Sequence, residues 1–338
     1  MEATAIREAG LIWAQTDAPG FSRRRRGRGW SYLDPAGERV GDEAVRARLD
    51  GLAVPPAWRD AWYCLDARGH IQATATDDRE RRQYVYHADW RAWRDRTKFA
   101  ELAGFVEALP AIRRAWRKGL EAEGVVDRAT ACVVALLDRG ALRIGSERYA
   151  KENGSFGATT LRKRHVEADG RTLRVAFRAK AGKWRDVAIR DPRLAKTVRA
   201  LGELPGQRLF DLEDEEGGRV ALSSGQVNRW LQAVTGETVT AKDFRTLAGT
   251  VAAFEALLPL EPGETRRARD AALKQAWEAA AERLGNTPTV ARTAYVHPAL
   301  AERWAEGQLG RLRGRARRMK LRVPLSERAV ALLARDAV

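Results

Sequence analysis

The sequence predicts an α+β protein, with a small antiparallel β-sheet domain at residues 1–88 and a larger, mainly α-helical domain at residues 89–338. Two changes of pattern predict this organisation. Up to about residue 88, short runs alternate apolar and polar residues between turn residues, whereas the later chain has long stretches with helical spacing of apolar residues. One island of three strand-like runs, at residues 160–191, interrupts those stretches and predicts a three-stranded antiparallel sheet inside the helical domain.

The first domain is expected to contain two hairpins and a final single strand. Trp62 and Cys64 alternate with polar neighbours, which is typical of a sheet with one buried face. Between the hairpins, residues 42–52 have helical spacing and are followed by Pro55, which cannot continue a helix. The strands are expected at residues 30–34, 37–40, 60–66, 70–77 and 81–87.

The second domain is expected to begin with amphipathic helices at residues 97–109, 110–122 and 126–140. Pro110 suits the first position of a helix, because its missing N–H has no partner there. In the β island, the turns Asp169-Gly170 and Ala181-Gly182 separate the three strands. From Pro192 to the C-terminus the spacing predicts helices again.

The positive charge of the chain predicts a polyanionic partner. Its formal net charge is +16 and its pI is near 10.4, and nucleic acid is the simplest explanation. Only ten of the 61 basic residues are lysine, and an arginine fork can give a phosphate two parallel hydrogen bonds. Arginine-rich codon use in a GC-rich genome is the alternative explanation of this bias. Basic runs at residues 23–28 and 311–322 are expected on surfaces or in mobile segments.

Several classes of protein are disfavoured. Cys64 and Cys132 are far apart and outside any metal-binding pattern, so two buried free thiols are expected. No run approaches the about twenty apolar residues of a membrane span, and the N-terminus lacks the pattern of a signal peptide. A cytoplasmic protein that makes no membrane contact is therefore expected.

The four histidines lie outside hydrolase, zinc-protease and kinase motifs, and no Walker loop is present.

Four distinctive strings carry a family resemblance. They are LLDRGALRIGSERYAKENGSFGATTL at residues 136–161, VAFRAKAGKW around Lys180, AKDFRTLAGT around Arg245, and LGNTPTVARTAYVHP around Asn286 and Tyr295. In this order and spacing the chain resembles the type IB DNA topoisomerases, specifically the small bacterial relatives of the poxvirus enzyme. RRQYVYH and RDRTKF resemble the end of that family's N-terminal domain, so the resemblance covers nearly the whole chain.

The resemblance implies a nucleophile at Tyr295, catalytic arginines at Arg143 and Arg245, and a catalytic lysine at Lys180. Asn286 stands where poxvirus members have a histidine, as in the bacterial branch. The implied enzyme is a monomer with an N-terminal DNA-clamp domain and a C-terminal catalytic domain. It nicks double-stranded DNA through a 3′-phosphotyrosyl intermediate, relaxes supercoils and needs neither metal nor ATP. Association with the nucleoid follows from such a substrate.

The residue types fit this chemistry. Transfer of a phosphodiester to tyrosine places negative charge on non-bridging oxygens, which two arginines and an amide can stabilise. Guanidinium groups favour the phenolate of tyrosine, and a lysine can protonate the leaving 5′ oxygen. Each residue alone has an ordinary structural explanation: a surface arginine, a core tyrosine, or a loop lysine or asparagine. Only the ordered combination favours catalysis.

Further DNA contacts are expected from the same resemblance. Gln83, Tyr84 and Tyr86 match positions on a strand that faces the major groove, where a glutamine and two phenols can reach base edges. A sheet face packed on its own helix is the alternative explanation of this strand. Tyr149 and Thr160 match phosphate-contacting positions, and Lys242 lies about one helical turn before Arg245.

Two other functions are compatible with parts of the pattern. A tyrosine recombinase shares the Arg, Lys, Arg, Tyr chemistry, but it usually carries a His-x-x-Arg box where this chain has Lys242 to Arg245. A tetrameric DNA complex in size-exclusion chromatography would favour it. A non-enzymatic architectural DNA-binding protein would explain the charge but would not need Tyr295, and a covalent-adduct assay separates it from an enzyme.

Overall fold

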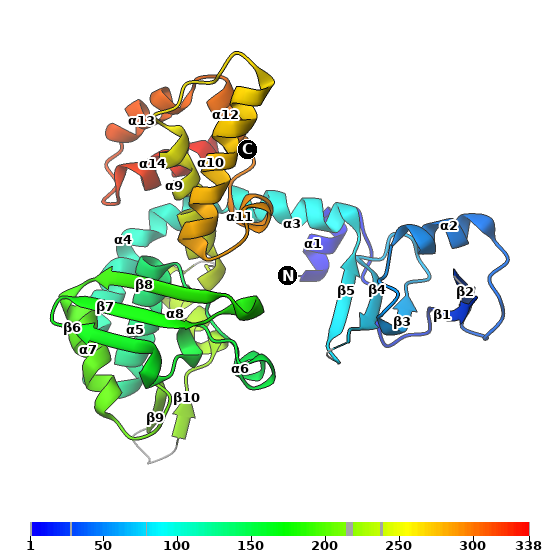
Figure 1. Cartoon of the computed structure of the whole chain (residues 1–338), viewed down its shortest axis with the longest axis horizontal. Coiled ribbons are helices and arrows are strands. Elements are labelled where there is room, and N and C mark those ends of the chain that lie inside the picture. The colour runs from blue at the N-terminus through cyan, green and yellow to red at the C-terminus, as the bar shows by residue number, and fades with distance from the viewer. Residues whose placement is uncertain (1, 28, 79, 214–218, 237–238, 338) are drawn as a thin grey trace. The chain divides into compact units, whose positions relative to one another are not determined.

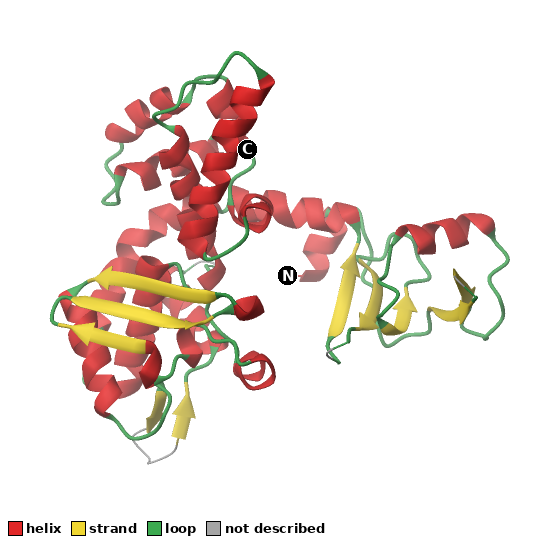
Figure 2. Cartoon of the chain, in the orientation of Figure 1, coloured by secondary structure: helices red, strands yellow, loops and turns green. Residues whose placement is uncertain are grey.

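The computed structural model describes residues 2–27, 29–78, 80–213, 219–236 and 239–337. The chain forms two compact units, Met1–Lys98 and Phe99–Val338. Strands and loops make up most of the first unit and helices most of the second (Figure 2). The units divide near the end of α3 (Ala88–Ala100), whereas the sequence places the domain boundary at the start of this helix, so the boundary after residue 88 stays a prediction.

The first unit is built on a five-stranded antiparallel sheet with the order β2-β1-β3-β4-β5. Tyr32, Tyr63 and Ala73 form its core with Leu49 of α2 (Glu43–Gly51). Asp42 caps this helix by accepting hydrogen bonds from two backbone N–H groups of its first turn. The other elements are α1 (Glu2–Glu8), β1 (Phe21–Arg26), β2 (Gly29–Leu33), β3 (Arg59–Tyr63), β4 (Ile71–Thr76) and β5 (Arg82–Tyr86).

The first basic run forms strand β1, which the sequence analysis missed. β2 pairs with β1 rather than with residues 37–40, which contribute only an isolated bridge. Arg23 of β1 donates hydrogen bonds to the carbonyls of Val54, Pro55 and Trp58, and its guanidinium lies 4.1 Å from the ring centre of Trp30. Arg23 is therefore partly buried against three backbone carbonyls, whereas Arg24, Arg25 and Arg26 are exposed, as expected for this run. Arg28 lies outside the described residues.

The second unit is mainly helical and contains the predicted three-stranded antiparallel sheet, in the order β6-β7-β8 (Figure 1). Its central helix is α5 (Val125–Gly140), in which every residue from 129 to 137 is buried. The strands are β6 (Val166–Asp169), β7 (Thr172–Arg178) and β8 (Trp184–Arg190). The other helices are α4 (Leu102–Gly119), α6 (Glu147–Asn153), α7 (Pro192–Glu203), α8 (Ser224–Thr235), α9 (Ala241–Leu257), α10 (Arg266–Leu284), α11 (Pro288–Tyr295), α12 (Ala299–Ala305), α13 (Leu309–Arg317) and α14 (Leu325–Arg335).

Three element predictions in this unit were wrong. Pro110 lies inside α4 rather than at a helix start, because an apolar stripe from Leu102 to Trp116 buries both halves as one helix. A short hairpin, β9 (Asp211–Glu213) with β10 (Arg219–Ala221), interrupts the helices expected after Pro192. Strand β6 begins only at Val166, since 3₁₀ turns occupy the preceding residues.

The two cysteines are buried free thiols, as the sequence predicts. The second basic run lies largely on α13, whose Leu309, Leu312 and Ala316 are buried. In the described part of the chain, no helix combines the length and apolarity that a membrane crossing needs.

Candidate active site

The ends of two helices bring Arg143 and Asn286 together. Helix α5 ends with Ala141 in the left-handed conformation, at φ 50°, and α10 ends with Gly285 at φ 62°. Such left-handed residues stop a helix and redirect the chain. Arg143 and Asn286 follow these two stops, and Nη2 of Arg143 donates a hydrogen bond to Oδ1 of Asn286. The side-chain Nδ2 of Asn286 is buried and has no hydrogen-bond partner among the described residues.

Arg245 bridges the same two helix ends from α9. Its side chain is only 3% exposed. Nη1 donates to the carbonyl of Ala141 at 2.5 Å, and Nη2 donates to the carbonyl of Leu284 at 3.0 Å. Burial, with the nearby charge of Arg143, lowers the pKa of Arg245 to about 10. Backbone acceptors therefore hold the guanidinium in place, although burial and the nearby positive charge destabilise its charged form.

Tyr295 lies at the end of α11 and packs against α9. Its backbone carbonyl accepts a hydrogen bond from Oγ1 of the buried Thr250 at 3.1 Å. Gly249 allows this close approach, because a Cβ at this position would lie 3.2 Å from Cβ of Tyr295 and 2.9 Å from Cδ1 of Leu284. The Arg245 guanidinium carbon lies 4.8 Å from the centre of the Tyr295 ring. The phenol is thereby fixed beside Arg245.

The pKa of Tyr295 is lower than that of an ordinary phenol. Burial of the half-buried side chain raises the pKa, but the positive charges of Arg245, Arg143 and Lys242 lower it by more. The site therefore favours the phenolate, which is the nucleophilic form of tyrosine. Lys242 itself is exposed in the first turn of α9.

The segment that carries Arg143 is held by a neighbouring turn. The carbonyl of Arg143 accepts a hydrogen bond from the N–H of Ala158 at 2.8 Å, and a Cβ at Gly157 would lie 2.7 Å from this oxygen. Thr160 closes the turn, because its Oγ1 accepts a hydrogen bond from the N–H of Gly157 at 2.9 Å. Tyr149 is half-buried on α6.

Lys180 is not brought into contact with the other four predicted catalytic residues. It begins the 3₁₀ turn Lys180–Gly182 between β7 and β8, in which Ala181 has φ 62° and Gly182 has φ 73°. The lysine is exposed and makes no hydrogen bond or ion pair with the described residues. A catalytic role would require the turn to approach the substrate.

The predicted groove-facing residues lie on β5 in the first unit. Side chains alternate along a strand, so Gln83 points away from the face that carries Tyr84 and Tyr86. The two tyrosine rings stack with their centres 6.1 Å apart, and Tyr84 is 42% exposed. Nε2 of Gln83 donates to Oδ2 of Asp77 at 2.8 Å. DNA contact by these residues stays a prediction.

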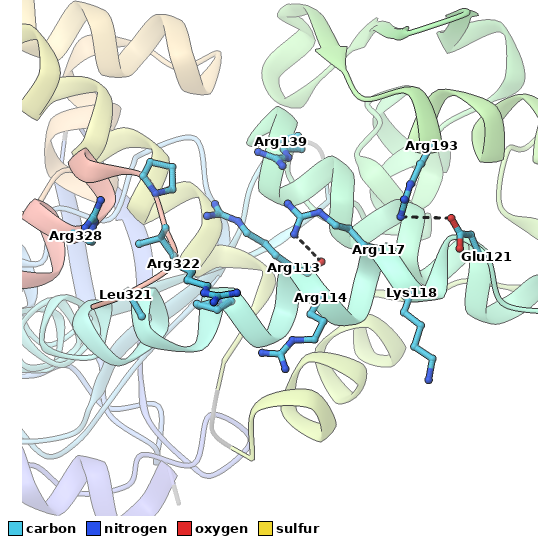
Figure 3. A pocket seen from close by; sticks show the side chains of 13 residues that line it. Arg113, Arg114, Arg117, Lys118, Glu121, Arg139, Arg193, Leu321, Arg322 and Arg328 are labelled. Atoms are coloured by element: carbon cyan, nitrogen blue, oxygen red, sulfur yellow. Dashed lines mark hydrogen bonds and ion pairs between the residues drawn. The ribbon is translucent and has the colours of Figure 1, made fainter. Parts of the chain in front are cut away.

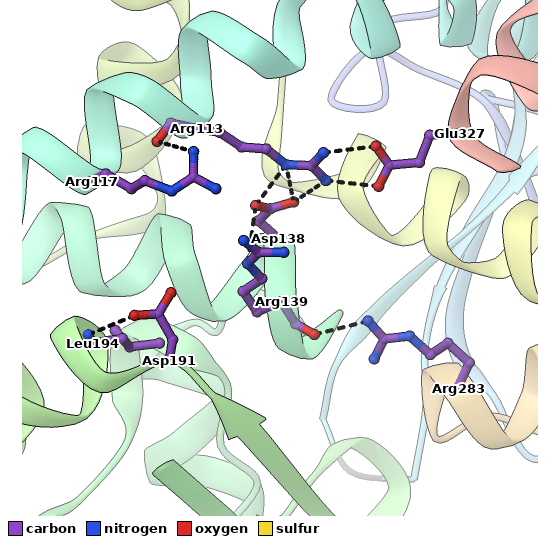
Figure 4. Close-up of polar contacts among 8 residues, drawn as sticks. All are labelled: Arg113, Arg117, Asp138, Arg139, Asp191, Leu194, Arg283 and Glu327. Atoms are coloured by element: carbon purple, nitrogen blue, oxygen red, sulfur yellow. Dashed lines mark hydrogen bonds and ion pairs between the residues drawn. The ribbon is translucent and has the colours of Figure 1, made fainter. Parts of the chain in front are cut away.

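Two arginines that the sequence analysis missed also bind the helix ends. Nη2 of Arg283 donates to the carbonyl of Arg139 at 2.8 Å (Figure 4). Arg185 donates to the carbonyls of Gly140, Glu282 and Arg283. No sequence signal marks either residue, since backbone carbonyls are present everywhere in the chain.

A buried ion network stabilises the same end of α5. Arg113 of α4 lies between two carboxylates, with Asp138 at 2.8 Å and Glu327 at 2.7 Å (Figure 4). Its guanidinium makes two hydrogen bonds to Glu327 and three to Asp138. Removing one member would leave a buried charge without its partner, at a cost of about 3–5 kcal/mol. The network ties α14 and α4 to the last turns of α5.

A basic pocket of about 1200 Å³ also lies in the second unit, and it contains none of the predicted catalytic residues (Figure 3). Arg114, Arg117 and Lys118 reach it from α4, and Arg193 reaches it from α7. Glu121 partly neutralises it by pairing with Arg193 at 3.5 Å. The pocket adds to the positive field of the unit, but it is separate from Tyr295.

Comparisons with known proteins cover most of the chain. Residues 87–320 match a family model described as the catalytic core of eukaryotic DNA topoisomerase I, and residues 29–77 match the N-terminal domain of bacterial DNA topoisomerase IB. DNA topoisomerase 1B of Acanthamoeba polyphaga mimivirus is 28% identical over 257 residues, which cover 74% of this chain and 76% of that protein. DNA topoisomerase 1 of Schizosaccharomyces pombe is 28% identical over 158 residues, which cover 45% of this chain and 18% of that protein.

Proposed function

Because the chain belongs to the type IB DNA topoisomerases, a family of isomerases, we propose that it relaxes supercoiled duplex DNA by cutting and resealing one strand through Tyr295. One observation carries the assignment of the nucleophile. The Arg245 guanidinium carbon lies 4.8 Å from the centre of the Tyr295 ring, and the charges of Arg245, Arg143 and Lys242 lower the pKa of this phenol by more than burial raises it. A phenol in an ordinary core has no such surroundings.

The proposed reaction is a reversible exchange of two phosphodiesters. The Tyr295 oxygen attacks the scissile phosphorus, the bond from phosphorus to the 5′ oxygen breaks, and a 3′-phosphotyrosyl bond forms. Lys180 donates the proton that the leaving 5′ oxygen requires. After the broken strand has swivelled, the 5′ hydroxyl returns its proton to Lys180 and attacks the phosphotyrosine, which releases Tyr295 as the phenolate. One phosphodiester replaces another in each step, so neither ATP nor a metal is required.

The non-bridging oxygens of the phosphate would be bound by Arg143, Arg245 and Asn286. The two guanidinium groups are held by backbone and side-chain acceptors before DNA arrives, and such preorganised donors stabilise charge that develops in a transition state. The unpartnered Nδ2 of Asn286 is a further donor for the same oxygens. A phosphate would also relieve the repulsion between the arginines.

Double-stranded DNA is the proposed partner, and the enzyme is proposed to act as a monomer in the cytoplasm, associated with the nucleoid. The net charge of +16 supports a polyanionic partner. Both family models and both relatives are described as topoisomerases, which favours this function over the recombinase and the architectural protein.

The function is tested by trapping the covalent intermediate. Wild-type protein is incubated with a duplex labelled on the 5′ side of the cut and is then denatured with detergent. Transfer of the label to protein, together with release of a strand with a free 5′ hydroxyl, is the expected result. A purely architectural protein would transfer no label.

Replacing Arg143 or Arg245 by alanine is expected to slow cleavage and resealing together. Both steps cross the same charged transition state, and removal of one such donor costs on the order of a hundredfold in rate. Single-turnover rates in both directions, at saturating protein, check this. Arg174→Ala on β7, which loses only an exposed pair with Asp186, is the control. If the variants lose DNA affinity but cleave bound DNA at the wild-type rate, the two arginines only bind the phosphate and do not stabilise the transition state.

Replacing Lys242 by glutamine is expected to move the pH dependence of cleavage upward. The lysine charge lowers the pKa of the Tyr295 phenol, so its removal raises this pKa, and a higher pH is needed to form the phenolate. Cleavage at limiting DNA, which reports the free enzyme, should fall most near neutral pH and recover as the pH rises. Lys274→Gln, which loses a surface pair with Glu278, should leave the profile unchanged. An unchanged profile for Lys242→Gln would contradict the charge argument.

A further inference from the structure

Three arginines donate hydrogen bonds to the last two carbonyls of α5 and to the carbonyl of Ala141, the residue that ends the helix, one arginine to each carbonyl. The carbonyl of Arg139 accepts from Arg283, that of Gly140 accepts from Arg185, and that of Ala141 accepts from Arg245. Carbonyls at a helix C-terminus have no partner within the helix and carry partial negative charge, so cations are stabilised there. Arg245 is a predicted catalytic residue, whereas the other two have no assigned role.

Arg185 makes contacts with both helix ends. From β8, its Nη2 donates to the carbonyl of Gly140 at 3.2 Å and to that of Arg283 at 2.6 Å, and its Nη1 donates to the carbonyl of Glu282 at 3.0 Å. One rigid, planar group therefore joins the end of α5 to the end of α10. A lysine, with a single nitrogen, could not reproduce this geometry.

The joined ends are those that position Arg143 and Asn286. Arg143 lies three residues beyond Gly140, and Asn286 lies three residues beyond Arg283. Packing is tight at this point, because a Cβ at Gly285 would lie 3.0 Å from Cδ of Arg185. A shift of either helix end would change the distance between the two side chains.

The surroundings of Arg185 destabilise its positive charge. Burial, with the charges of Arg245, Arg283 and Arg143, lowers its pKa to about 10. Neutral donors could satisfy three carbonyls without this repulsion. The three hydrogen bonds to backbone carbonyls hold Arg185 in place despite this repulsion.

We propose that Arg185 is a positioning residue for strand transfer, which holds Arg143 and Asn286 at the separation needed to bind one phosphate. This inference rests on the proposed function. Arg185 acts through the two side chains that contact the phosphate, and not by contact with the reacting atoms. Its removal should therefore resemble the loss of Arg143 rather than the loss of Lys180.

The test begins with single-turnover cleavage by Arg185→Ala and Arg185→Gln at saturating protein, with Arg174→Ala as the control. A misplacement of about 1 Å at a reacting centre can cost on the order of a hundredfold, and a loss of this size is expected for Arg185→Ala. DNA affinity should stay within a few fold of wild type. Arg185→Gln retains one donor and a neutral side chain, so its loss should be smaller. Cleavage by both variants at the wild-type rate would overturn the proposal.

A double-mutant cycle separates positioning from general destabilisation. If Arg185 acts through Arg143 and Asn286, replacing it by alanine in the Arg143→Ala background should slow cleavage by a smaller factor than the same replacement in the wild type, because the two effects are not independent. If the rate losses of the two single variants multiply in the double variant, Arg185 acts independently of Arg143, and this result would overturn the proposal. The cycle can be repeated with Arg185→Gln if the alanine variant melts before the assay temperature.

A substrate with sulfur in place of the bridging 5′ oxygen adds a second readout. Arg185→Ala should stay slow on this substrate, because its partners bind non-bridging oxygens. Rescue by sulfur would show that Arg185 acts through the neighbouring Lys180 turn instead, which contradicts the assignment. Lack of cleavage by the wild-type protein would refute the proposed function itself and is therefore distinguishable from failure of this inference.

Discussion

Tyr295→Phe is expected to abolish both the covalent adduct and the relaxation of supercoiled DNA, while DNA binding stays within a few fold of wild type. The change removes only the phenolic oxygen. The ring that lies 4.8 Å from the Arg245 guanidinium carbon is retained, as is the backbone hydrogen bond from Thr250, so the fold should be preserved. Label transfer to denatured protein and a filter-binding titration measure the two properties separately.

A second phenol provides the matched control for this variant. Tyr32 lies in the first unit, and its hydroxyl donates to Asp50 at 2.7 Å. Tyr32→Phe should still form the adduct, although it loses a hydrogen bond that contributes about 1 kcal/mol to stability. Substantial relaxation by Tyr295→Phe would place the nucleophile at another residue.

Lys180→Ala is expected to cleave ordinary DNA at a rate lower by a factor on the order of a hundred or more. Without an acid, the 5′ oxygen must leave as an unprotonated alkoxide. The lysine is exposed on a turn and makes no hydrogen bond or ion pair with the described residues, so its replacement should not disturb the fold. Lys183→Ala, on the same connection between β7 and β8, is the matched control for a nonspecific loss of charge.

Sulfur at the bridging position identifies the role of Lys180. A thiolate leaves without protonation, so Lys180→Ala should cleave this substrate nearly as fast as the wild-type protein does. Arg245→Ala should remain impaired on the same substrate, because its proposed partners are non-bridging oxygens. If sulfur does not rescue Lys180→Ala, the lysine acts by charge or position, and another group must be the acid.

Periodicity was sufficient to predict most of the fold. The alternation in β3, β4 and β5 and the three runs of the β island all correspond to strands. The errors arose where tertiary contacts outweighed local signals. Pro110 continues a helix because the apolar stripe of α4 runs past it. The arginine-rich β1 is a strand because backbone carbonyls and Trp30 accommodate Arg23.

The candidate site was predictable only for residues in the four strings that carry the family resemblance. The ordered strings identify Arg143, Arg245, Asn286 and Tyr295, and the structure brings these four together. Their catalytic roles remain predictions. Arg185 could not be found in this way, because its hydrogen bonds to backbone carbonyls produce no recognisable sequence pattern.

We propose that this chain exchanges DNA phosphodiesters through Tyr295 without an energy source. Relaxation of supercoiled plasmid in EDTA, without ATP, tests it most directly, with Tyr295→Phe run in parallel. The wild-type protein is expected to convert the plasmid to relaxed topoisomers, and the variant is expected to leave it supercoiled. Wild-type protein that leaves the plasmid supercoiled under these conditions, or relaxes it only after ATP or a metal is added, would contradict the claim.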